Sequence, residues 1–116
     1  MLRKEWKWFG LAGHFCGARE CRYHLCTQVG DFLISTVGAY FPGNTETMQE
    51  IGCGRQFETM VFKAGEPCSE IGCMCGQPRI DGCGIDMKGY NTAGEAQEGH
   101  MLMCNKFAHE NPELIE

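Results

Sequence analysis

The chain has 116 residues, of which 43% are apolar, and its 15 acidic and 10 basic residues give a net charge of −5. This length allows one domain with one core, because domains cluster near about 100–150 residues. The acidic balance argues against a general nucleic-acid surface, which needs clustered lysine and arginine. No run of about 18 apolar residues occurs, so the sequence predicts no transmembrane helix and no membrane partner.

Cysteine and glycine are both abundant, at nine and 16 residues. The N-terminal residues contain no apolar core of a secretory signal, so we expect a cytoplasmic protein. Thiols stay reduced in that compartment, and cysteines interleaved with histidine therefore favour metal ligation over disulfides. The glycines raise the entropic cost of folding, so the fold needs a source of stability besides its hydrophobic core. We expect bound zinc to provide it.

The first half of the chain predicts an antiparallel sheet. Alternating side chains predict strands at 21–29 and 32–40, joined at Gly30-Asp31 by a type II′ turn, which favours glycine at its first central position. A third strand is predicted at 56–63. Residues 6–11 are a candidate fourth strand.

The second half combines an irregular segment with a helix. Residues 65–91 carry cysteine, glycine and proline without apolar periodicity, which predicts a loop. No apolar pattern would hold this loop in place, so it needs a cross-link or a bound metal. Thr92-Ala93-Gly94-Glu95 matches a capping box and predicts a helix over 92–110. The predicted fold class is therefore α+β, with a small antiparallel sheet within 1–63 and a C-terminal zinc knuckle plus α-helix, in one domain spanning 1–116.

Four residues form the predicted zinc site, namely Cys73, Cys75, His100 and Cys104. The first two stand in a tight turn followed by glycine, where two thiolates can share one ion. The other two are one helical turn apart, so their Cβ atoms lie about 5–6 Å from each other. Two questions stay open at this point. Cys68 or Cys83 would serve in place of one ligand, and His100 and Cys104 are alternatively ordinary residues of the apolar helix face.

A second predicted metal site contains His14, Cys16, Cys21 and His24. Side chains alternate along a strand, so Cys21 and His24 point to opposite faces if both lie in it. The site therefore requires residues 14–21 to form a loop. The alternative is a set of separate buried cysteines, which behave as small hydrophobic residues.

Catalytic interpretations are weaker. Cys21 with His24, or Cys26 with His14, would make a nucleophile pair only if the thiolate were partly exposed. A hydrolytic zinc needs an open coordination position and a nearby carboxylate, for which Glu58 and Asp81 are candidates. Thiolate-rich ligand sets favour closed structural zinc instead. We therefore expect a binding protein, with a metal-dependent hydrolase or nuclease as the alternative and a structural virion component as a second alternative.

Two resemblances add to this interpretation. Residues 73–107, with a cysteine turn followed by a helix that carries His100 and Cys104, resemble a treble-clef zinc finger. Most of the chain is also similar to a group of small cysteine- and histidine-rich proteins of tailed bacteriophages and prophages. The second resemblance implies a phage origin and a bacterial cytoplasm during infection, and it supplies no activity and no catalytic residues. The expected role, binding of a host protein or small ligand by a zinc-containing accessory protein, follows from the closed zinc site, which builds a rigid surface. The segments that carry the second resemblance are Gly13-His14-Phe15-Cys16, Cys21-Arg22-Tyr23-His24, Ser35-Thr36-Val37-Gly38 with Tyr40, Phe57-Glu58-Thr59-Met60-Val61-Phe62, and Gly99-His100 with Met103-Cys104.

Overall fold

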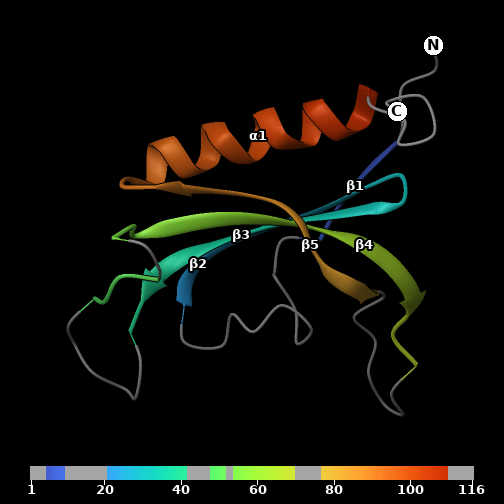
Figure 1. Cartoon of the computed structure of the whole chain (residues 1–116), viewed down its shortest axis with the longest axis horizontal. Helices are drawn as coiled ribbons and strands as arrows, with labels where there is room; N and C mark the ends of the chain where they lie inside the picture. Colours follow the sequence, from blue (N-terminus) through green and yellow to red (C-terminus); the bar gives the residue numbers. More distant parts are fainter. Residues whose placement is uncertain (1–4, 10–20, 42–47, 52–53, 70–76, 110–116) are drawn as a thin grey trace.

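A computed structural model shows one antiparallel sheet with a C-terminal helix lying across one of its faces (Figure 1). It describes residues 5–9, 21–41, 48–51, 54–69 and 77–109. The five described strands neighbour one another in chain order, β1-β2-β3-β4-β5. The α+β class is therefore confirmed. The predicted knuckle at 73–76 lies outside the described residues.

The central hairpin matches the sequence prediction. β2 spans Cys21–Val29 and β3 spans Phe32–Tyr40, and Val29 pairs with Phe32 across the two-residue turn. Gly30 has a φ of 58°, whereas Asp31 is not among the residues with positive φ. Positive φ at the first central position alone fits a type II′ turn and excludes type I′. The turn residue thus sets the register of the hairpin.

Two further strands extend the sheet on either side. β1, Trp6–Trp8, pairs with the end of β2 and is shorter than the predicted 6–11. β4, Phe57–Pro67, pairs with β3 and is longer than the predicted 56–63. Phe57, Thr59 and Val61 are all buried, as their alternation predicted.

The loop predicted at 65–91 is wrong over most of its length. β5 spans Pro78–Tyr90 and pairs with β4, which itself runs to Pro67. The register shifts twice between these strands, and Gly82 has a φ of 89°, which favours glycine. Glycine-rich strands lack apolar alternation, so backbone pairing with β4 forms this strand without a periodic sequence signal.

The helix α1, Ala93–His109, begins at the predicted cap. The Thr92 hydroxyl accepts a hydrogen bond from the Glu95 N–H at 3.1 Å, and the Glu95 carboxylate accepts one from the Asn91 N–H at 3.2 Å. The carboxylate thus serves the residue before the cap, one position earlier than in the usual capping box. The capping prediction is confirmed. No helix among the described residues has the length and hydropathy needed to cross a membrane.

The main core lies between α1 and the sheet. Its buried members come from the turn end of the central hairpin, from β4 and from the second half of α1, with Trp6 packed against them. They are Val29, Phe32, Ile34, Val61, Met103, Cys104, Phe107 and Ala108. Lys106 also bonds Asp86 of β5 with an Nζ–Oδ2 distance of 2.8 Å, which lowers the pKa of that carboxyl group. The helix is therefore held along its C-terminal half.

Candidate functional site

A buried polar row crosses the interface between α1 and the sheet. The His100 side chain has no solvent exposure. Its Nε2 lies 2.9 Å from the hydroxyl of Thr27 on β2, and its Nδ1 lies 2.6 Å from the hydroxyl of Thr36 on β3. The Thr36 hydroxyl also bonds the hydroxyl of Thr59 on β4. Imidazole and hydroxyl groups thus link three strands to the helix.

This row holds the imidazole in its neutral form. Burial lowers the pKa of His100 to about 4, because desolvation penalises the cation. A neutral imidazole has one N–H and one acceptor nitrogen, so one threonine hydroxyl accepts from the ring and the other donates to it. Trp8 contacts the same ring edge-on, with ring centroids 6.2 Å apart. The site therefore satisfies both ring nitrogens without a charged partner.

Cys104 lies one helical turn after His100 and is also fully buried. Desolvation raises the pKa of its thiol to about 11, so the thiol stays protonated at neutral pH. A nucleophile or metal ligand needs the thiolate instead. As placed here, Cys104 is a core residue in contact with the apolar cluster.

Tyr90 closes the β5 end of the polar row. Its ring lies against the backbone of Gly99, and a Cβ added to that glycine would overlap two ring carbons and the phenol oxygen. Tyr90 is 6% exposed, and burial raises the pKa of its phenol. Gly99 therefore allows α1 to approach the sheet closely at this point.

The structure brings together only half of the predicted zinc site. His100 and Cys104 lie on the sheet-facing side of α1, whereas Cys73 and Cys75 lie outside the described residues. Within the described parts of the chain, no group of three or more His, Cys, Asp or Glu side chains is arranged to hold a metal ion. Zinc binding therefore stays a prediction. A metal bound to His100 would have to replace one of the two threonine hydrogen bonds.

The second predicted metal site is also only partly described. His14 and Cys16 fall outside the described residues. Cys21 is the first residue of β2 and is buried against Val37, Tyr40 and Ile51. His24 is three residues before Thr27 and so lies on the sheet face opposite α1. This site also stays a prediction.

The alternative ligands and carboxylates belong to β4, to β5 and to the residue that follows β4. Cys68 is half-buried, and its N–H donates to the carbonyl of Gln77 at 2.8 Å. Cys83 and Asp81 belong to β5. Glu58 is half-buried on β4, where desolvation raises its pKa. Because Glu58 is one residue from Thr59, it lies on the opposite sheet face from His100, so it does not approach the predicted zinc ligands.

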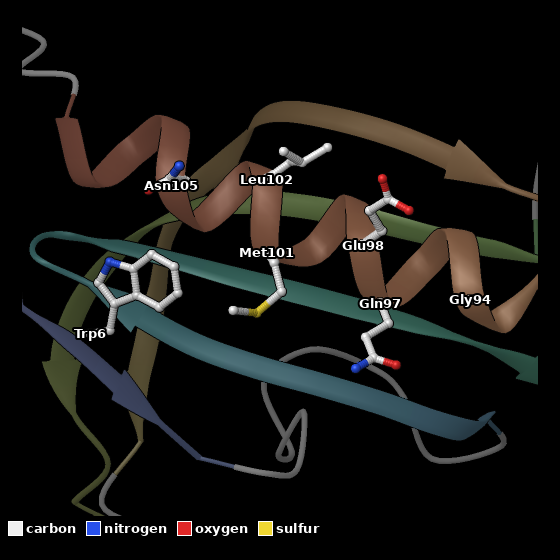
Figure 2. Close-up of a pocket in the computed structure, with 7 residues that line it drawn as sticks. All are labelled: Trp6, Gly94, Gln97, Glu98, Met101, Leu102 and Asn105. Carbon is white, nitrogen blue, oxygen red and sulfur yellow. The ribbon is translucent and has the colours of Figure 1, made fainter.

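A groove lies between β1 and α1, and we call it the β1–α1 groove. It has a volume of about 520 Å³ and is lined by Trp6, Gly94, Gln97, Glu98, Met101, Leu102 and Asn105. Figure 2 shows Met101 and Gln97 pointing from α1 towards the strand side, where the Trp6 ring lies. Leu102 and Glu98 point away from Trp6 and form the upper rim.

Apolar side chains are unusually exposed along this groove. Met101 is 49% exposed and Leu102 is 60% exposed, and Trp8 on β1 is 57% exposed. Leu102 also lines two smaller hollows on the β5 side of α1, with volumes of about 330 and 260 Å³. Exposed apolar side chains thus occur both on β1 and on the outer side of α1. Exposed apolar side chains that gather on one face are typical of interaction sites.

Sequence reasoning missed this groove. The helical pattern assigned His100, Met103 and Cys104 to the apolar face, which left Met101 and Leu102 on the outer side. Two adjacent large apolar residues on the solvent side of an amphipathic helix are the signal that would have indicated a second apolar surface. Trp6 joins it only through the β1–β2 pairing. Comparison of the chain with protein-family models, curated proteins and solved structures found no match.

Proposed function

We propose that this chain is a binding protein and that it binds another polypeptide at the β1–α1 groove. The observation that carries this proposal is the exposure of Met101, which points towards Trp6, and of Leu102 on the rim of the groove, on a helix whose other side packs against the sheet. Burying such side chains contributes about 25 cal/mol for each Å² of apolar surface removed from water. The amides of Gln97 and Asn105 line the same groove and offer hydrogen bonds to a partner.

The enzyme alternative has less support from the described residues. His100 and Cys104 are buried, neutral and bonded within the core, and Glu58 lies across the sheet from them. General acid–base chemistry requires a titratable group within hydrogen-bond reach of a substrate. The groove instead presents apolar and amide side chains, which suit recognition.

Zinc binding by Cys73, Cys75, His100 and Cys104 is a separate proposal, and the site at His14, Cys16, Cys21 and His24 is a weaker one. The spacing of the cysteine turn and the helical pair supports the first site. In this proposal zinc is structural and fastens the segment before β5 to the helix. A phage origin rests on the sequence resemblance alone. A host protein or small ligand as partner, the bacterial cytoplasm as the location and a structural virion role as the alternative stay proposals.

Paired aspartate substitutions test the binding proposal. Met101→Asp places a charge in the groove, whereas Ile85→Asp makes the same change at a side chain that is 53% exposed on β5 and does not line the groove. We expect the wild type and Ile85→Asp to capture the same protein from bacterial lysate, and Met101→Asp to lose it while melting at the same temperature. Equal capture by Met101→Asp would show that the partner does not bind at the groove.

A further inference from the structure

The outward side of α1 is arranged symmetrically about one exposed leucine. Leu102 is 60% exposed, the highest fraction among the large apolar side chains that the structure describes. Apart from the buried His100, the helix carries acidic side chains seven and four residues before this leucine and basic ones four and seven residues after it. These side chains share one exposed face of the helix. Together they form what we call the outer stripe, namely Glu95, Glu98, Leu102, Lys106 and His109.

The order of charges along the outer stripe is complementary to itself when reversed. In two antiparallel stripes related by a twofold axis at Leu102, each Glu98 stands level with Lys106 of the other copy. Each Glu95 likewise stands level with His109. Both pairs form twice, because contacts in a twofold interface are reciprocal. The helix dipole favours acidic residues at the start and basic residues at the end of any helix, but it requires neither equal spacing nor an exposed leucine between them.

The surface beside Leu102 has room for the same residue of a second copy. Leu102 borders two hollows on the β5 side of α1, with volumes of about 330 and 260 Å³. Gly99 borders both hollows as well and has no side chain, so the helix surface is low one turn before the leucine. A leucine that projects from a second helix can therefore enter beside Leu102, as side chains do in helix–helix packing.

The charged side chains of the outer stripe are accessible to a second copy. Figure 2 shows Glu98 pointing away from Trp6. Glu98 also lines the hollow that contains Arg55 and Lys88, but no ion pair joins it to either of them in the described part of the chain. Lys106 bonds Asp86, yet its side chain is 49% exposed, and an ammonium group with three hydrogens can bond more than one carboxylate.

We propose that two copies of this chain associate through their outer stripes, with the α1 helices antiparallel and the two Leu102 side chains in contact at the twofold axis. This contact goes beyond the proposed function, because Leu102 points away from Trp6 whereas Met101 in the β1–α1 groove points towards it. One helix from each copy makes a small interface, so the dimer is weak and reversible.

Sedimentation equilibrium of the full chain from micromolar to millimolar concentration tests the association. We expect the wild type to dimerise as its concentration rises. Leu102→Asp should stay monomeric, because it places two carboxylates at the twofold axis. Ile85→Asp makes the same change at a side chain that is 53% exposed on β5 and lies outside the stripe, so it should dimerise within about twofold of the wild-type affinity.

Charge reversal tests the antiparallel pairing. Glu98→Lys alone and Lys106→Glu alone should each weaken dimerisation by about tenfold, because both symmetric pairs become repulsive. An equimolar mixture of the two variants should form a heterodimer with about the wild-type affinity. In that mixture the lysine introduced at position 98 faces the glutamate introduced at position 106, and the unchanged residues at these positions face each other. Lys106→Glu also loses the bond to Asp86, so thermal melting is used to check that this variant is folded.

Three results would each overturn the inference. They are a wild type that stays monomeric at millimolar concentration, dimerisation that persists in Leu102→Asp, and a mixture of folded variants that associates no better than each variant alone. None of them bears on the proposed function. A natural partner that Met101→Asp loses would still support binding at the groove, whatever the oligomeric state.

Discussion

The hydroxyl of Thr36 lies 2.6 Å from Nδ1 of His100, although 64 residues separate the two in the chain. The same imidazole reaches Thr27 through its other nitrogen. These two hydrogen bonds fix where α1 lies along the central hairpin, since buried polar groups strongly favour having partners. Apolar packing alone would tolerate small shifts of α1 along the sheet. The hydrogen bonds of the polar row do not, because they would be broken by such a shift.

Acid should weaken the fold through His100. The unfolded histidine binds a proton near pH 6.5, but the folded one does so only near pH 4, so between these values the unfolded state holds more protons. We expect the free energy of unfolding to be unaffected by His100 above pH 6.5, to fall as the pH drops towards 4, and to lose about 3 kcal/mol in total. Urea titrations between pH 7.5 and 3.5 measure this loss.

A glutamine variant separates His100 from the carboxylates that titrate in the same range. His100→Gln removes the titrating group and should flatten the pH dependence between 6.5 and 4. Parallel curves for His100→Gln and wild type would contradict the assignment of the effect to His100.

Gly99 should be intolerant of even a methyl group. Gly99→Ala places a Cβ into the Tyr90 ring and should cost about 1–3 kcal/mol of stability, which is typical of overpacking. Gly94→Ala, on the same helix but facing open space, should be neutral or stabilise by up to about 1 kcal/mol. Thermal and urea unfolding of both variants provide the comparison. Equal effects would mean that helix propensity alone governs the two positions.

The start of α1 should depend on the Thr92 hydroxyl. Thr92→Ala removes the acceptor for the Glu95 N–H and should destabilise the protein by about 1 kcal/mol. Thr92→Ser keeps an acceptor and should stay within about 0.5 kcal/mol of wild type. Chemical unfolding followed by far-ultraviolet circular dichroism measures both. If the serine variant loses as much as the alanine variant, the hydroxyl contributes nothing to the cap.

Zinc content tests the proposed metal site. We expect elemental analysis to find one zinc for the first site, and Cys75→Ser or Cys104→Ser to lose it together with much of the stability, because structural zinc contributes roughly 10–16 kcal/mol in finger peptides. Cys53→Ser serves as the control and should retain the metal. A folded protein that contains no zinc and melts identically with and without chelator would refute the proposal.

Several elements were predictable because their signals are local. Gly30-Asp31 between two alternating runs predicted the central hairpin, and Thr92 followed by Glu95 predicted the start of the helix; both are confirmed. β5 was not predictable, because its glycines remove the alternation that marks a strand. The buried polar row around His100 was even harder to predict from the sequence. His100 and Cys104 were correctly placed on one helix face, but their neighbours come from β2, β3 and β4.

The sequence by itself determined the turn, the cap and which side chains share a face, since each depends on residues within a few positions of one another. Only the tertiary structure decided that His100 meets two threonine hydroxyls and that Met101 faces Trp6 across a groove. These contacts join residues 64 to 95 positions apart, and no periodic pattern encodes which distant strand a helix covers. The packing of α1 across the sheet brings them together.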